Sequence, residues 1–368
     1  MARRRTGAAR RWALVVGLVA VLLALPSVIG ALPASDAGTP AADLRRAVLA
    51  SADVPFAGYA QSAGGLDLPV GDQLTSAADL LSDRTTMRAW YRGPADWRVD
   101  VVAPTGETGV HADPGGTWTW TWERAVATRT APSPLALPTA PDLLPSALGR
   151  RLLSEATDAE LSRIGADRLA GRDALGVRLR PADTASSVSR VDVWVDDASG
   201  VPLRVQVFGA DDGQAALDTG FLEFEPTTPP AEVTAFDPPP EAELREGQDA
   251  QLLQSATRAA ADGHRVRLPA ALAGLDRRTI EGAPRSVGLY GRGVTLLAVS
   301  PLPGRAADGL RDALVRAPGV VVDHLGVRIS AGPLGLMLVD GEDGPVLLTG
   351  TVDLDALATA ATDLVPAW

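Results

Sequence analysis

Residues 117–123 alternate strictly between threonine and tryptophan and end on a glutamate, Thr-Trp-Thr-Trp-Thr-Trp-Glu. In a β-strand successive side chains point to opposite faces, so Trp118, Trp120 and Trp122 would share one face. In a helix Trp120 would point away from the other two, and no common apolar face would form. The segment therefore predicts a β-strand that buries three indole rings, each with a large apolar surface and one N–H donor.

Two interpretations of this tryptophan face remain open at the level of sequence. The indoles can fill a core beneath a helix, or they can line a cavity for an apolar ligand. The two coincide if a helix closes the cavity and moves when the ligand binds. Trp90 and Trp97, which lie on neighbouring strand patterns, are further candidates for the cavity lining.

Strand patterns dominate the chain from about residue 56 to residue 245. Met87–Arg92 alternates, Gly93-Pro94 is typical of a turn, and a second alternating run follows. One long helical pattern interrupts the strands at residues 142–164, where leucines recur at helical spacing. We therefore expect an N-terminal domain over residues 45–245.

The stretch from Pro226 to Pro240 contains six prolines and marks the exit from this domain. Residues 250–368 then predict a smaller α+β domain, with strands near 293–300, 326–329, 335–339 and 346–351 and helices near 305–316 and 353–364. The expected fold class of the whole chain is α+β.

The N-terminus carries five arginines before an uncharged run from Trp12 to Leu32. The run is close to the roughly 20 residues that span a bilayer, and the arginine cluster favours a cytoplasmic N-terminus. Residues 1–32 therefore predict a signal anchor or, if they are cleaved, a signal peptide. Residues 33–44 would be a tether that places the domains at the extracytoplasmic face of the membrane, or in the medium after cleavage.

Composition excludes several classes of function. The formal net charge is −11, and the part beyond the arginine cluster is more acidic still, which argues against nucleic acid as a partner. The chain has no cysteine and no lysine, so disulfides, thiolate metal sites, an acylated cysteine and lysine-based catalysis are excluded. The three histidines lie far apart, and no nucleotide-binding or hydrolase motif is present. We expect no enzyme activity, no cofactor and no metal.

Four segments resemble the LolA-like superfamily. They are Val54-Pro-Phe-Ala-Gly-Tyr-Ala, Arg88-Ala-Trp-Tyr-Arg-Gly-Pro-Ala-Asp-Trp-Arg-Val-Asp, Gly116-Thr-Trp-Thr-Trp and Val193-Trp-Val-Asp-Asp-Ala-Ser-Gly-Val-Pro-Leu-Arg-Val. The resemblance covers about residues 45–245, and the two-domain layout is most similar to the RseB/MucB type. It implies a strongly curved, incompletely closed antiparallel half-barrel, with a helical plug over a hydrophobic concave face. The helical pattern at residues 142–164 would supply part of the plug.

The resemblance implies a protein that binds a lipid, an acyl chain or a lipoprotein in the half-barrel. The predicted hydrophobic lining is Trp118, Trp120 and Trp122, together with Trp90 and Trp97. The alternative is an RseB-like regulator that binds an anti-sigma factor and modulates an envelope-stress sigma factor. The expected partners are thus a lipid or acylated protein, or an anti-sigma factor or other membrane protein.

Overall fold

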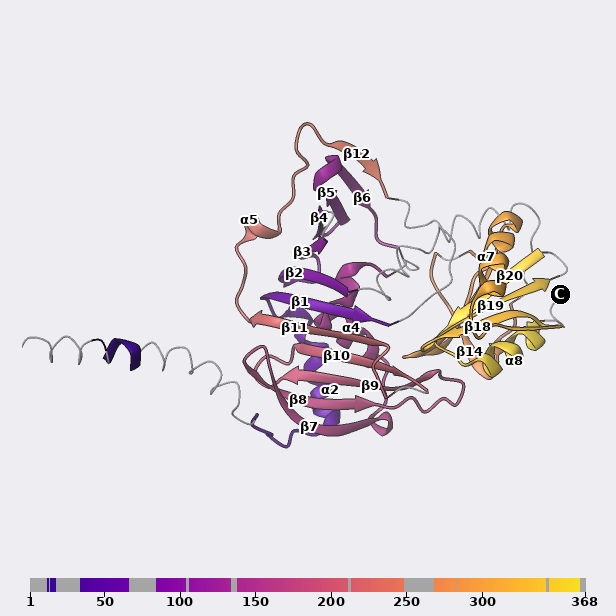
Figure 1. Cartoon of the computed structure of the whole chain (residues 1–368), viewed down its shortest axis with the longest axis horizontal. Coiled ribbons are helices and arrows are strands. Elements are labelled where there is room, and N and C mark those ends of the chain that lie inside the picture. The colour runs from indigo at the N-terminus through magenta and orange to yellow at the C-terminus, as the bar shows by residue number, and fades with distance from the viewer. Residues whose placement is uncertain are drawn as a thin grey trace, which may run out of the picture.

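The structure is a computed structural model. It describes residues 12, 14–17, 34–65, 84–103, 106–133, 138–210, 213–247, 268–282, 284–341 and 344–364. The described residues form two β-sheets with a few short helices packed on them (Figure 1). The first sheet has twelve strands and the second has eight. The expected α+β class is confirmed only in part, because the molecule is mostly β and its large antiparallel sheets are curved and not closed.

The twelve-stranded sheet has the order β12-β6-β5-β4-β3-β2-β1-β11-β10-β9-β8-β7, so β12 and β7 are its open edges. It consists of two meanders, β1 to β6 and β7 to β11, that join where β1 pairs with β11. The strands are β1 (Phe56–Gly64), β2 (Arg84–Gly93), β3 (Asp96–Ala103), β4 (Gly106–Asp113), β5 (Gly116–Thr121), β6 (Val126–Thr130), β7 (Leu161–Leu169), β8 (Arg172–Leu179), β9 (Val188–Asp196), β10 (Pro202–Gly209), β11 (Leu217–Glu225) and β12 (Glu243–Glu246).

One face of this sheet, called here the helix face, packs against α2 (Ala41–Ala50), the short helix η3 (Ala140–Leu143) and α4 (Pro145–Leu153). Apolar side chains that alternate along the strands form the cores beneath these helices. Aromatic rings gather where β1, β2 and β11 meet, with Phe56 stacked on Tyr91 at 5.1 Å and edge-on to Phe221 at 5.4 Å between ring centroids. We call the opposite side of the sheet the outer face.

The long helix predicted for residues 142–164 is wrong in length. Leu144 has an extended backbone, with φ −56° and ψ 135°, so η3 and α4 are separate, and Pro145 begins α4. After α4 the chain forms the short helix η4 (Asp158–Glu160), whose capping box uses Thr157 and Glu160. From residue 161 onward the chain is strand β7, because its backbone pairs with β8. The leucines of α4 and of the start of β7 happen to follow one helical spacing, and the prediction therefore joined them into a single helix.

The proline-rich segment after β11 crosses to the far end of the first sheet (Figure 1). It contains the short helix α5 (Ala231–Thr234), which contacts β2 and β3. It ends in β12, which pairs in parallel with β6 from Glu243 beside Val126 to Glu246 beside Arg129. We call residues 226–247 the strap. Its course explains why six prolines stand here, since most of the strap forms no sheet hydrogen bonds that a proline would remove.

The second sheet has the order β13-β14-β15-β16-β20-β19-β18-β17 and carries one helix on each face. Residues that alternate along β19 divide between the two cores: Leu336 and Leu338 pack toward α7, and Met337 and Val339 toward α8. The elements are β13 (Ala271–Leu272), β14 (Leu275–Arg278), β15 (Gly288–Arg292), β16 (Thr295–Pro301), α7 (Gly304–Arg316), β17 (Val321–Asp323), β18 (Gly326–Ala331), β19 (Leu334–Gly341), β20 (Gly344–Gly350) and α8 (Leu354–Leu364).

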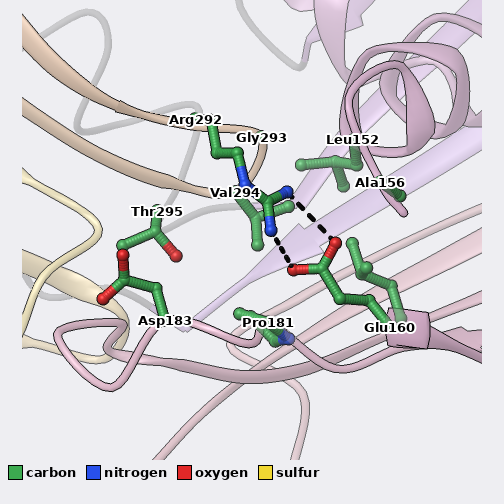
Figure 2. A pocket seen from close by; sticks show the side chains of 10 residues that line it. Leu152, Ala156, Glu160, Pro181, Asp183, Arg292, Gly293, Val294 and Thr295 are labelled. Atoms are coloured by element: carbon green, nitrogen blue, oxygen red, sulfur yellow. Dashed lines mark hydrogen bonds and ion pairs between the residues drawn. The ribbon is translucent and has the colours of Figure 1, made fainter. Parts of the chain in front are cut away.

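The two sheets meet at a joint rich in hydrogen bonds. Arg292 donates from both Nη atoms to the carboxylate of Glu160, at 3.1 and 2.9 Å (Figure 2). Arg278 makes a second bidentate pair with Glu155, at 3.0 and 2.6 Å. Backbone hydrogen bonds join the loop before β9 to the end of the second sheet, from Ser187 N to Thr351 O at 3.2 Å and from Asp353 N to Ala185 O at 3.0 Å.

Most of the predicted membrane anchor lies outside the described residues. Among the residues that are described, no helix is both long enough and apolar enough to cross a membrane. The proposed tether before α2 is described only from residue 34 onward.

Candidate functional site

A cavity of about 290 Å³ opens on the helix face between the β2–β3 hairpin and the helices η3 and α4. Its apolar wall includes Tyr91, Trp97 and Val99 from the strands and Leu144 and Ala147 from the helical side. These strand residues share a face because Tyr91 lies opposite Trp97, and Ala89 opposite Val99. The cavity is therefore a gap in the packing between sheet and helices, lined mainly by aromatic and aliphatic side chains, as ligand sites usually are.

Tyr91 is fixed within this wall. Its ring stacks on Phe56, and its hydroxyl donates a hydrogen bond of 2.6 Å to the carbonyl oxygen of Ala52. Burial raises the pKa of Tyr91, so the phenol stays protonated at neutral pH. Trp97 donates its indole N–H to the carbonyl oxygen of Pro94 at 3.2 Å, which leaves the faces of its ring free for apolar contact.

One cation stands at this cavity without a partner. Arg150, in the last turn of α4, lines the cavity, and its guanidinium carbon lies 5.5 Å from the centre of the Tyr91 ring. Its Nη1 atom is buried and has no hydrogen-bond partner among the described residues. Burial lowers the pKa of Arg150, an effect opposed by Tyr91 and by the negative charge of Asp53. Arg98 also borders the cavity, but its side chain lies on the outer face, where it donates two hydrogen bonds of 2.7 Å to Asp100.

The predicted tryptophan face lies on the outer face of the sheet. Register places Trp118 beside His111, His111 beside Arg98, and Arg98 beside Trp90, in a row across β5, β4, β3 and β2. Arg98 stacks over Trp90 at 5.2 Å, and Arg129 stacks over Trp118 at 5.1 Å. The threonines of the same strand face the other side, because Thr119 pairs with Val110, which lies opposite Val99.

The strap covers part of this row. Phe236 lies 4.7 Å from the His111 ring and 5.9 Å from that of Trp118, between centroids, and His111 Nδ1 is 3.1 Å from the carbonyl oxygen of Thr234. Burial lowers the pKa of His111, so the ring is neutral at pH 7 and can donate from Nδ1 to that carbonyl. A second cavity, of about 420 Å³, opens beneath the strap, with Trp118 and Asp96 on its walls.

The five predicted tryptophans thus separate. Trp97 borders the cavity on the helix face. Trp90 also touches this cavity, but its ring lies on the outer face under Arg98, and Trp118 borders the cavity beneath the strap. Trp120 is 5% exposed and packs edge-on against Trp122 at 5.6 Å. Trp122 belongs to the short helix η2 (Trp122–Arg124) and is 53% exposed. The structure does not bring the five into one cavity, and a ligand role for each stays a prediction.

Sequence reasoning did not single out Tyr91 or Arg150. Tyr91 stands in the alternating run of β2, and counting by two from Met87 through Ala89 places it on the helix face. Arg150 follows Ser146 and Ala147 by four and three residues, which is the spacing of one helical face. Helical spacing does not show which element a helix packs against, so the contact between this face of α4 and the β2–β3 hairpin could not be predicted.

No described residues form a cluster of histidine and acidic side chains that could hold a metal ion. A crevice at the joint between the sheets is lined by Glu160, Arg292 and Val294 (Figure 2), but its free volume is about 10 Å³. That is room for about one water molecule, and the carboxylate and guanidinium there already satisfy each other. This crevice belongs to the joint and not to a ligand site.

The fold and the cavity define a class: a protein with two β-sheets, of which the first is open and curved, with helices on one face and a cavity beside them. No family model and no curated protein matches the sequence. Among solved structures, the chain is similar to MucB in the MucA/MucB complex of Pseudomonas aeruginosa, with 18% identity, a TM-score of 0.47, and coverage of 87% of this chain and 96% of that one.

A structure of MucB alone is similar as well, with 17% identity, a TM-score of 0.47, and coverage of 88% of this chain and 96% of that chain. A LolA superfamily protein from Nitrosomonas europaea is 10% identical, with a TM-score of 0.26, and matches 54% of this chain and 99% of its own length. These similarities agree with the resemblance expected from the sequence, and they concern the fold alone.

Proposed function

We propose that this protein is a non-enzymatic binding protein whose helix-face cavity takes an apolar group such as the acyl chain of a lipid or an acylated protein. The observation that carries the proposal is the cavity of about 290 Å³ between the β2–β3 hairpin and α4, walled by Tyr91, Trp97, Val99 and Leu144. An open cavity of this size, lined mainly by apolar side chains, is suited to an apolar ligand.

Binding would draw its free energy from apolar burial, at about 0.8 kcal/mol for each methylene removed from water. The walls are held in place by contacts that need no ligand, namely the Phe56–Tyr91 stack and the hydrogen bond from Tyr91 to Ala52. The opposite wall is α4, a helix of nine residues. A small shift of α4 away from the hairpin would widen the cavity for a longer chain.

The location that we propose is the extracytoplasmic face of the cytoplasmic membrane, with residues 1–32 as the anchor and the N-terminus in the cytoplasm. This position would bring the cavity close to the lipids and acylated proteins that it binds. The arginine cluster before the apolar run supports that orientation.

The test is native mass spectrometry of the full chain, expressed with its N-terminal segment and purified in a mild detergent, followed by lipid extraction. We expect a co-purifying lipid at near-stoichiometric level, and a loss of most of it in Trp97→Ala, which removes one wall of the cavity. Trp122→Ala is the matched control, since Trp122 is exposed and borders neither cavity. A protein that is empty and ignores added lipids would refute the proposal.

A second candidate function is regulation through a protein partner, an anti-sigma factor by the resemblance to the RseB/MucB type. The observation that favours it is an exposed apolar patch at the β12 edge of the first sheet. Leu244 is 64% exposed and lies beside Ala127 of β6. Ala127 in turn lies beside Trp120 of β5, and the ring of Trp122 packs edge-on against that of Trp120. Apolar side chains grouped at an accessible sheet edge are typical of protein-binding surfaces.

The two candidates predict different behaviour of the same variants. If the edge patch binds a protein, a double variant of Trp122→Ala and Leu244→Ala loses that partner in a pull-down from membranes, and it keeps its lipid. If the partner is retained by this double variant and lost with Trp97→Ala, the edge patch is not the binding surface.

A further inference from the structure

Arg150 on α4 differs from the arginines that pair with aspartates across the strands, because its buried Nη1 atom has no acceptor among the described residues. On the strands, arginines form bidentate cross-strand pairs with aspartates, such as Arg178 with Asp192 at 2.5 and 2.6 Å and Arg204 with Asp218 at 2.9 and 2.6 Å. Arg150 has a buried Nη1 atom with no hydrogen-bond partner among the described residues, and its only ring contact there is with Tyr91. A buried guanidinium nitrogen without an acceptor is costly, and such a cost usually has a function.

No carboxylate among the described residues hydrogen-bonds Arg150. Asp142 lines the same cavity, but its carboxylate caps η3 by accepting hydrogen bonds from the backbone N and hydroxyl of Thr139, at 2.8 and 2.9 Å. Arg98 is satisfied by Asp100. Asp53, at the end of the short helix η1 (Ser51–Asp53), acts on Arg150 only through space. The cavity therefore holds one carboxylate, Asp142, whose hydrogen bonds come from Thr139, and one cation without a hydrogen-bond acceptor in the described part of the chain, Arg150.

The position of this charge gives the cavity a polar end. Ser146, Ala147 and Arg150 present one side of α4 to it, and the facing wall on β2 and β3 is aromatic and aliphatic. A molecule that fills the cavity with an apolar chain would bring its head group within reach of the guanidinium if that head group lies at the α4 end. An oxyanion there would form charge-assisted hydrogen bonds with Arg150, and a neutral head group would leave the cation unpaired.

We infer that the ligand of this cavity is an anionic amphiphile, whose carboxylate or phosphate group is received by Arg150 while its chain lies against Tyr91 and Trp97. The inference rests on the proposed function, because it names the head group of the ligand that the cavity takes. Arg150 acts as the residue that selects an anionic head group over a neutral one. Carboxylate and phosphate share the chemistry that a guanidinium recognises.

The test compares ligands that differ only in the head group. Isothermal titration at pH 7 with the full chain would use decanoate, 1-decanol and decyl phosphate below their aggregation limits. We expect decanoate to bind about ten- to a hundredfold more tightly than decanol, which is the range for a hydrogen bond to a charged group. In Arg150→Met this preference disappears and the affinity for decanol is unchanged, and Arg150→Lys keeps part of the preference.

Arg151→Met is the matched control, because Arg151 is the next residue on α4 and is exposed. It should leave the preference of the wild type intact. Far-ultraviolet circular dichroism and thermal unfolding of each variant would show that the fold is retained. The ratio of the decyl phosphate and decanoate affinities assigns the head group to phosphate or to carboxylate.

Two outcomes overturn the inference, and they are distinct. If decanol and decanoate bind equally, or if the preference survives Arg150→Met, the selection by Arg150 is wrong while the apolar cavity stands. If none of the three ligands binds the wild type, the proposed function fails and the inference fails with it.

Discussion

At the scale of single residues, the chemistry of this chain is set by its use of arginine as the only basic side chain besides histidine. The guanidinium matches a carboxylate with two parallel hydrogen bonds, and the first sheet uses this geometry repeatedly between neighbouring strands. Against that background an arginine that lacks an acceptor is conspicuous. Arg98, whose side chain lies on the outer face, has Asp100 as its acceptor, whereas Arg150 on the helix face has a buried Nη1 atom without an acceptor among the described residues.

This difference predicts opposite effects on stability. Arg98→Met leaves the buried carboxylate of Asp100 without its guanidinium, and we expect a loss of about 3 kcal/mol in the free energy of unfolding. Arg150→Met removes a half-buried charge that has no hydrogen-bond acceptor among the described residues, so we expect stability to be unchanged or higher. Urea unfolding of the two variants checks both signs. An equal loss in both would mean that Arg150 has a stabilising partner in the free protein.

At the scale of elements, the helix face depends on how closely α4 approaches β10. A Cβ atom added at Gly149 would lie 2.8 Å from Cβ and Cγ of Pro202, so only glycine allows this approach. The same approach holds α4 opposite the β2–β3 hairpin and so fixes the width of the cavity. Gly149 also lies directly before Arg150 in the helix.

Replacing this glycine gives a prediction with an internal control. Gly149→Ala should destabilise the protein by about 1–3 kcal/mol through overpacking, although alanine favours helices. Gly309→Ala, in the middle of α7, meets nothing within 4 Å and should stabilise the protein by up to about 1 kcal/mol. Thermal and urea unfolding distinguish the two. A stabilised Gly149→Ala would show that α4 can move away from β10 without cost.

The sequence predicted many of the helices and strands, but it did not show which of them pack against one another. The helices near residues 305–316 and 353–364 are found as α7 and α8, because apolar spacing and helix ends are local signals. The strand at Thr117–Thr121 was evident from its alternation, but alternation does not tell which face is covered, or by what. Phe236 on the strap decides this, and it lies more than a hundred residues away in the sequence.

The candidate site was predictable only in part for the same reason. Trp97 could be named from the strand pattern, and it lines the helix-face cavity. Arg150 stood inside a helical pattern, where an arginine normally reaches solvent. Its burial follows from the packing of α4 against the sheet, which periodicity alone does not contain.

At the scale of the whole molecule, the joint between the sheets depends on ionised carboxylates. Burial raises the pKa of Glu160, but hydrogen bonds from Arg292, Thr157 and the backbone N of Ala182 outweigh burial and lower it to about 2 from an ordinary value of 4.5. Glu155 also has a lowered pKa, chiefly through its hydrogen bond from Arg278. These pairs join arginines of the second sheet to Glu155, just before η4, and to Glu160, the last residue of η4.

The lowered pKa values of Glu160 and Glu155 predict that stability falls as the pH is lowered. The folded pKa of Glu160 lies below its unfolded value, so its contribution to stability is complete above pH 4.5 and is lost as the pH falls from 4.5 to about 2. We expect Glu160→Gln to be less stable than the wild type at pH 7, with a smaller further loss between pH 4.5 and 2. Denaturant unfolding at a series of pH values measures this, and parallel curves for the two proteins would contradict it.

The seam between β1 and β11 has a consequence for how the chain reaches its native state. β1 is the first strand of the sheet to be synthesised, yet it lies in the middle and pairs with the last antiparallel strand, β11, on one side. Until residue 225 has emerged, the early meander presents β1 as an unpaired edge to any extended peptide nearby. Such long-range closure makes folding slow, so a chaperone that shields this edge should raise the yield of native protein more than one that acts on the second sheet.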